Sequence, residues 1–122
     1  MKNNNQISHF DERCLIIKIR DSHPNVYDRV RRCWRISINK AKQTDYVLAV
    51  IKGRVEGIYI STKWYAPFDK NCNNKCPNFP CNGKRIGFIG KEADINIQKK
   101  YLYKYLPDFY MRSGPGPVLY TY

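Results

Sequence analysis

Long apolar runs are absent from this chain of 122 residues. The longest uninterrupted apolar stretches, such as residues 15–17 and 47–51, are far shorter than the about 20 residues that a membrane-spanning helix needs. Residues 1–8 are polar and hold no apolar segment of the kind found in secretion signals. The sequence therefore predicts a cytoplasmic protein without a membrane partner.

Groups suited to acid–base catalysis are also few. The two histidines, His9 and His23, are expected in surface loops. No nucleophile elbow G-x-S-x-G, phosphate-binding P-loop or H-E-x-x-H pair occurs. Glu56, Glu92 and Asp94 lie near expected strand ends, where salt bridges with neighbouring Lys and Arg explain them better than catalysis. We therefore expect a noncatalytic protein that uses no cofactor.

Acidic residues are scarce, because ten Asp and Glu stand against 22 Lys and Arg and leave a formal net charge of +12. A small domain needs a net charge of only about 2 to 8 for solubility, and a larger excess of one sign opposes compaction. Such an excess is typical of proteins with a polyanionic partner, so nucleic acid or a nucleotide is the expected partner.

The composition fits one folded domain, since 43% of the residues are hydrophobic and 14% are aromatic. We interpret residues 1–13 as a polar N-terminal leader and residues 14–122 as a single basic α/β domain. Residues 66–84 are rich in Cys, Pro and Asn, have no periodicity, and are expected to form a loop insertion in this domain.

Periodicity and turn signals predict the order strand, helix, helix, strand, strand, loop, strand, helix, strand. The expected strands are residues 14–20, 46–52, 55–61, 85–90 and 118–122. The expected helices begin after caps at Ser22, Ser37 and Asp94, and Gly53-Arg54 is the expected hairpin turn. The fold class is therefore α+β, with a mixed sheet or open barrel and two to three short helices.

The first expected helix has an apolar side and a cationic side. Val26, Val30, Cys33 and Trp34 recur at helical spacing and are expected to pack in the core. Arginines occupy the opposite side, and the second expected helix adds lysines. The cations expected to bind the polyanion are Arg29, Arg32, Arg35 and Lys40.

Aromatic residues beside lysines form a second candidate surface. Lys63, Trp64 and Tyr65 follow the hairpin strand, and Phe68 lies in the loop. Flat rings next to cations suit base stacking, worth about 1 to 3 kcal/mol per base, with neutralisation of the phosphate. Trp64 fits equally well as a core residue that closes the end of the sheet. The stretch 99–112 alternates tyrosines with cations and is either a packed strand edge or a second stacking surface.

Five cysteines are present, and an odd number argues against a complete disulfide framework. Cys72, Cys76 and Cys81 have the spacing C-x3-C-x4-C, which offers three zinc ligands where a structural site needs four. Free thiols are the simpler interpretation, so we predict no metal site. Cys14 and Cys33 lie in apolar patterns and are expected in the core.

Several motifs together resemble a small bacterial and phage domain that accompanies some GIY-YIG endonuclease-like proteins and is similar in strand order to PUA-like modules such as ASCH and EVE domains. The motifs are WRIS at 34–37, DYVLAV at 45–50, GIY at 57–59, KW at 63–64, RIGFIG at 85–90 and the run 99–107. The resemblance covers residues 14–122 and implies binding of RNA, a modified base or a nucleotide in a pocket with aromatic walls and a basic rim. The Cys-rich insertion departs from that pattern.

The GIY motif at 57–59 does not make this chain a GIY-YIG nuclease. That family joins its two motifs by a short turn, whereas about thirty residues separate GIY from FIG at 88–90 here. Two functions remain open. One is a noncatalytic module that binds nucleic acid, including a modified or unpaired base. The other is a protein that senses or sequesters a small anionic nucleotide in a bacterial or phage conflict system.

The charge argument makes a direct prediction about salt. Affinity for single-stranded or duplex nucleic acid should fall by about 0.7 to 0.9 log units per log unit of salt for each neutralised phosphate, because binding releases counterions. Titrations at several salt concentrations measure the slope. A binding constant that does not change with salt would remove charge as the basis of binding.

Overall fold

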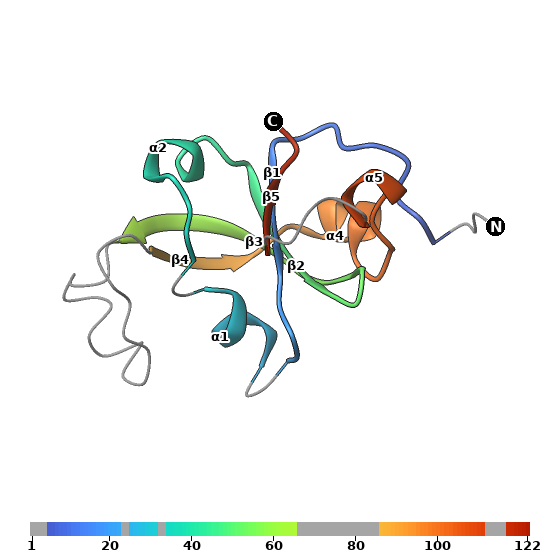
Figure 1. Ribbon diagram of the computed structural model, residues 1–122, viewed down its shortest axis with the longest axis horizontal. Coiled ribbons are helices and arrows are strands. Elements are labelled where there is room, and N and C mark those ends of the chain that lie inside the picture. The colour runs from blue at the N-terminus through green and yellow to red at the C-terminus, as the bar shows by residue number, and fades with distance from the viewer. Residues whose placement is uncertain (1–4, 23–24, 32–33, 66–85, 112–116) are drawn as a thin grey trace.

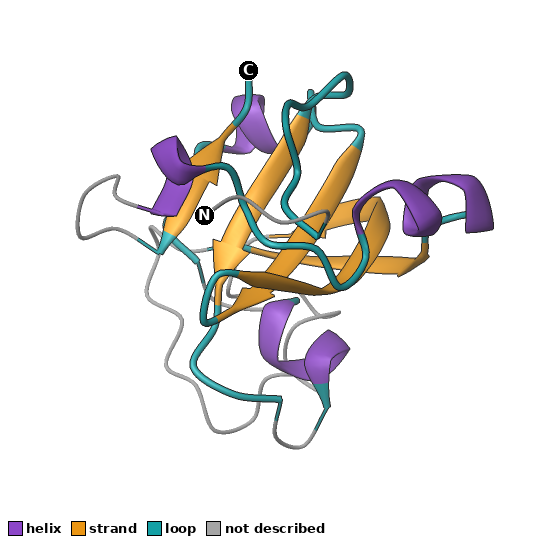
Figure 2. Ribbon diagram, turned by 90° about the vertical axis from the view of Figure 1, so that its right-hand side faces the viewer, coloured by secondary structure: helices purple, strands orange, loops and turns teal. Residues whose placement is uncertain are grey.

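A computed structural model of the chain describes residues 5–22, 25–31, 34–65, 86–111 and 117–122. Five strands form one mixed sheet in the spatial order β4-β3-β2-β1-β5, which is not closed into a barrel (Figures 1 and 2). The strands are β1 (Cys14–Lys18), β2 (Tyr46–Ile51), β3 (Arg54–Tyr65), β4 (Gly87–Glu92) and β5 (Val118–Tyr120). The predicted α+β class with a mixed sheet is confirmed.

β1 and β2 pair in parallel, and every other neighbouring pair is antiparallel. The two short helices α1 (Val26–Val30) and α2 (Ile38–Ala41) lie in the connection between β1 and β2. Ser37 caps α2 as predicted, but Asn25 takes the place expected for Ser22 and caps α1 by accepting a hydrogen bond from the Asp28 amide at 2.9 Å.

α1 is shorter than the apolar spacing predicts, because the helix ends at Val30 and Trp34 already pairs with Ile86 in an isolated bridge. Trp34 still packs against the core, and its indole nitrogen donates to the carbonyl oxygen of Val30 at 2.7 Å. Cys33 lies outside the described residues.

The hairpin between β2 and β3 turns at Lys52-Gly53, one residue earlier than expected. Both residues have positive φ, 51° and 83°, which is the backbone of a type I′ turn matched to the twist of the two strands. β3 then runs to Tyr65, well beyond the predicted end, so Lys63 and Trp64 lie on a strand paired with β4.

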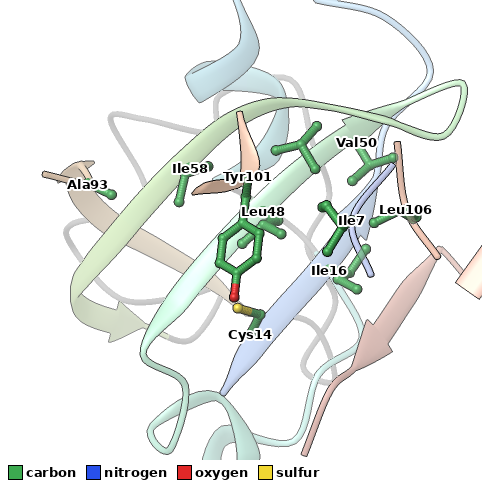
Figure 3. Close-up of a cluster of buried hydrophobic side chains, with 10 residues drawn as sticks. Ile7, Cys14, Ile16, Leu48, Val50, Ile58, Ala93, Tyr101 and Leu106 are labelled. Carbon is green, nitrogen blue, oxygen red and sulfur yellow. The ribbon is translucent and has the colours of Figure 1, made fainter. Parts of the chain in front are cut away.

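Alternating residues of the strands bury both faces of the sheet. Ile16 and Leu48 point to one face, which is covered by α4 (Ile95–Tyr101), α5 (Asp108–Met111) and the segment before β1. Figure 3 shows this cluster, with the Tyr101 ring standing among its aliphatic side chains. Leu15 and Val47 point to the other face, covered by α1 and α2. The two helix pairs accordingly lie on opposite sides of β1 in Figure 1.

α4 begins after Asp94 as predicted, although the Asp94 side chain makes no capping hydrogen bond. α5 was not predicted. Among the described residues, no helix is long and apolar enough to cross a membrane.

Residues 5–13, which belong to the expected polar leader, pack on the sheet. Ile7 is 4% exposed, and its amide donates to the carbonyl of Tyr105 at 2.8 Å. The Glu12 carboxylate accepts hydrogen bonds from the Tyr101 hydroxyl and from the Lys100 ammonium. Cys14, the first residue of β1, is fully buried as expected, and burial raises the pKa of its thiol to about 12.

The Glu12 contacts make stability depend on pH. Burial opposes ionisation of Glu12, but hydrogen bonds from Tyr101 and Lys100 outweigh burial and hold its pKa below the ordinary 4.5. A depressed pKa adds stability above that pH, and this stability is lost as the pH falls through the folded-state value. We expect Glu12→Gln to lower the free energy of unfolding by about 1 to 2 kcal/mol near neutral pH, because the charged hydrogen bonds are lost.

The difference between the two proteins should shrink below about pH 4.5, where wild-type Glu12 also becomes protonated. Urea denaturation at several pH values measures it. A difference that persists unchanged into acid would show that the charge of Glu12 contributes nothing.

Candidate functional site

The described arginines of α1 and its C-cap, Arg29 and Arg31, lie close to carboxylates. The Arg31 side chain is buried, and its Nε donates to an Asp28 carboxylate oxygen at 2.8 Å. The Arg29 side chain is 30% exposed, with its Nε 3.6 Å from an Asp21 carboxylate oxygen. Arg35 is exposed, and Arg32 lies outside the described residues. The α1 arginines therefore face carboxylates of neighbouring residues.

Lys40 is part of the scaffold. Its Nζ donates to the Tyr122 carbonyl at 3.1 Å and lies 4.4 Å from the centre of the Tyr120 ring, while the Tyr122 hydroxyl donates to the Lys40 carbonyl at 2.6 Å. These contacts hold β5 and Tyr122 against α2.

Trp64 packs on the end of the sheet. Its ring centre is 5.0 Å from that of Phe88, and its indole nitrogen donates to the Ser61 hydroxyl at 3.1 Å. Lys63 beside it is exposed. Of the two alternatives for Trp64, core packing is the one that these contacts support. Outside the described residues lie Phe68, Cys72, Cys76, Cys81 and the side chain of Tyr65.

An open cavity of about 370 Å³ lies between the start of α1 and the end of the β3–β4 pair at which β4 ends. Residues 25–27 form one side, Tyr59 of β3 forms the floor, and residues 90–92 of β4 form the other side. The volume falls in the range of small-molecule sites, about 300 to 1,000 Å³.

Gly57 makes room for the Tyr59 ring that forms the floor of this cavity. A Cβ atom at Gly57 would lie 2.7 Å from the Tyr59 hydroxyl and 2.9 Å from Cγ1 of Val26. Because position 57 has no side chain, the Tyr59 ring can lie back along β3 beneath α1. Tyr59 is thereby buried and lines the cavity.

The outer edge of β4 fixes the other wall. Its amides at Ile86 and Phe88 donate to the carbonyls of Trp34 and Arg31, at 2.9 and 2.7 Å. The next outward amide, that of Gly90, donates to the Tyr27 hydroxyl at 3.0 Å. α1 and the residues after it therefore cover this sheet edge, and Tyr27 is held in place at the cavity.

Tyr27 and Tyr59 form one aromatic wall, since their ring centres are 5.3 Å apart and leave no slot between them. Phe88 backs both rings, at 6.2 and 6.5 Å. Among the described residues, the Tyr59 hydroxyl has no hydrogen-bond partner. Burial, with a smaller effect of the Glu92 charge, raises the pKa of Tyr59 to about 12, so the hydroxyl keeps its proton at neutral pH and can donate it.

Lys91 and Glu92, two exposed neighbours on β4, also line the cavity. Their side chains leave the strand on opposite faces, so Glu92 shares the face of its pairing partner Tyr59 and Lys91 stands at the rim. The site thus combines two aromatic rings tilted by 51° to each other, a hydroxyl donor, a carboxylate acceptor and an ammonium at the rim. This combination suits a planar ring with polar edges and an attached anionic group. Within the described ranges, no group of three or more His, Cys, Asp or Glu residues could hold a metal ion.

Sequence reasoning assigned no binding role to Tyr27, Tyr59 or Lys91, although Tyr59 belongs to the GIY motif at 57–59. One available signal was Gly57 inside a strand and two residues before Tyr59, because such a glycine often marks a close approach of another group. Comparisons with protein-family models, curated proteins and solved structures give no match in any of the three. The site is therefore defined by the geometry of this chain alone.

Trp64→Leu separates packing from binding. We expect a loss of about 1 to 3 kcal/mol in the free energy of unfolding, because the smaller side chain leaves Phe88 without its ring contact. Ligand affinity at the cavity should not change, because Trp64 does not line it. Urea denaturation and a ligand titration measure the two effects. Intact stability with reduced affinity would instead make Trp64 a pocket wall.

Proposed function

We propose that this protein is a noncatalytic binding module for nucleic acid that holds an unpaired or modified base in the cavity of Tyr27 and Tyr59. The observation that carries the proposal is Tyr59, which lines an aromatic-walled cavity and whose hydroxyl donor has no partner among the described residues. Among the described residues, Arg29 Nε is the one fully buried polar side-chain atom without a hydrogen-bond partner, so water reaches the Tyr59 hydroxyl in the free protein. A ligand that accepts the hydrogen bond of this hydroxyl takes the place of that water.

Each group of the cavity has a role in holding a base. The aromatic wall stacks against the ring of the base, and the Tyr59 hydroxyl donates to a ring carbonyl or nitrogen. The Glu92 carboxylate accepts from an exocyclic amino group, as carboxylates do with cytosine. Lys91 neutralises the adjoining phosphate. A tyrosine that stays protonated at neutral pH serves binding better than proton abstraction.

The alternative ligand is a small anionic nucleotide, free in solution, because the cavity volume also accommodates one. Glu92 next to Lys91 disfavours a group of several phosphates, whereas a nucleic-acid strand places a single phosphate near each base. We therefore favour nucleic acid. The PUA-like resemblance and a cytoplasmic location agree with this choice and belong to the same proposal.

Tyr59→Phe tests the proposal with a change of one oxygen atom. We expect the free energy of unfolding to stay the same or rise slightly, because the hydroxyl has no partner to lose. Affinity for a single-stranded oligonucleotide with the preferred base should fall by about 1 kcal/mol, or roughly fivefold, because the hydrogen bond to the base is lost. Calorimetric titration with short oligonucleotides and with free nucleotides measures affinity and separates the two ligand classes.

Lys91→Ala and Lys42→Ala are a matched pair, since both remove one exposed ammonium but Lys42 follows α2, away from the cavity. We expect only Lys91→Ala to reduce the affinity markedly. Unchanged affinity in both Tyr59→Phe and Lys91→Ala would exclude the cavity as the binding site.

A further inference from the structure

Exposed apolar side chains gather in one part of the described chain. Six large apolar residues are exposed among the described residues, and four of them fall between residues 103 and 111. We name these four the 103–111 patch; they are Tyr103, Tyr105, Phe109 and Met111. Tyr103 and Phe109 are the most exposed, at 56% and 71%. Concentrations of this kind mark interaction surfaces, whereas single exposed apolar residues do not.

Three members of the patch, Tyr103, Tyr105 and Met111, lie around the β2–β3 turn, and Phe109 belongs to the same short helix as Met111. A Cβ atom at Gly53 would touch both Met111 and Tyr105, so these side chains lie over the turn. The Arg54 guanidinium stacks over the Tyr103 ring, 5.2 Å from its centre. In Figure 1, the turn between β2 and β3 and helix α5 lie on the same side of the molecule.

The backbone conformation that exposes the Tyr103 ring is energetically unfavourable. Tyr103 has a φ of 64°, which is unfavourable for a bulky side chain. Hydrogen bonds from the Tyr103 amide to the Val55 carbonyl, at 2.8 Å, and from the Val55 amide to the Lys104 carbonyl, at 2.9 Å, hold this conformation. The ring is therefore exposed on a rigid support and loses little freedom when a partner binds.

Two ammonium groups adjoin the rings. Lys52 lies in the turn and Lys104 lies between the two tyrosines in sequence, and neither has an ion-pair partner among the described residues. The acids nearby are already engaged, since Glu56 pairs with Arg54 at 2.6 Å and Asp108 accepts from Gln6 at 2.8 Å. Because the Gln6 amide is neutral, Asp108 keeps its charge, and Lys52 and Lys104 together leave a net positive charge of one beside the rings.

We propose that the 103–111 patch binds the bases and phosphates of single-stranded nucleic acid, as a second contact surface beside the cavity. Rings interleaved with cations stack successive unpaired bases, which a duplex keeps inside its own stack. The chain's net charge of +12 favours a polyanion and opposes association with a second copy of the same chain. The inference rests on the proposed function and adds the form of nucleic acid that is bound.

The test compares three ligands on the full chain: a single-stranded oligonucleotide of roughly 15 nucleotides, a duplex of the same sequence, and a nucleoside monophosphate. The test variant is Tyr103→Gly with Phe109→Ser. We expect its affinity for the single strand to fall at least tenfold, because two stacking rings are lost, while affinity for the monophosphate stays unchanged. The melting temperature should hold or rise, because glycine adopts the positive φ of position 103 without strain.

Matched controls on the far side of the molecule are Ile38→Ala and Lys42→Ala, which remove an exposed apolar side chain and an ammonium from α2 and its end. They should leave the single-strand affinity unchanged. Lys52→Ala with Lys104→Ala should in contrast lower the salt slope by about 0.7 for each lysine.

The double variant could keep the full wild-type affinity for the single strand while Tyr59→Phe binds it more weakly. This result would overturn the proposed role of the patch and leave the proposed role of the cavity standing. A wild-type protein that binds none of the three ligands would overturn the proposed function and the patch together. Loss of binding to vesicles of phosphatidylglycerol, without any loss for the single strand, would assign the patch to membranes and overturn the inference.

Discussion

The parallel pairing of β1 with β2 is the constraint from which the rest of the structure follows. Parallel neighbours cannot be joined by a tight turn, so the chain must cross from one end of the sheet to the other between them. α1 and α2 occupy that crossover and lie over one face. Because the crossover also reaches the outer edge of β4, it closes that edge and carries Tyr27 to Tyr59. The cavity thus results from the crossover connection between β1 and β2.

Some positively charged side chains of this protein hold the fold together, and others are exposed to solvent. Arg31 and Arg54 pair with carboxylates close in sequence, and each guanidinium also lies over a tyrosine ring. Several lysines, among them Lys52, Lys63 and Lys91, are exposed instead. Planar guanidinium groups suit such fixed, stacked contacts, whereas the hydrated ammonium remains available to a diffusing anion. The net charge therefore does not show how many of the positive charges are accessible to a ligand.

Local signals were enough for most of the fold. The β-branched run of β1, the Ser37 cap and the glycine of the hairpin each act within a few residues, and the structure has them where the sequence predicts. The turn shifted by one residue because Lys52 adopts a positive φ, which lysine seldom does and which pairing of the flanking strands imposes. The early end of α1 likewise comes from pairing of the following residues with β4.

The site was less predictable, because it depends on contacts between distant segments. Trp64 and Lys40 have the residue types of a binding surface, yet tertiary packing uses them elsewhere, against Phe88 and Tyr122. Tyr59 has an ordinary strand pattern, and only the approach of α1 gives its ring a cavity to face. No periodicity within one strand contains that information.

The short edge strand β5 has a consequence for how the molecule opens. The edge strand β5 has only three residues, and the contacts of Lys40 with Tyr120 and Tyr122 attach this end of the chain to α2. We call these contacts the clasp. β5 is also held by its pairing with β1 and by the amides of Lys18 and Thr121, and we expect this margin of the sheet to open before the four other strands separate. Amide hydrogens of β5 would then exchange with solvent earlier than those of β2. The bared side of β1 would also be open to strand pairing with another molecule, which the clasp normally prevents.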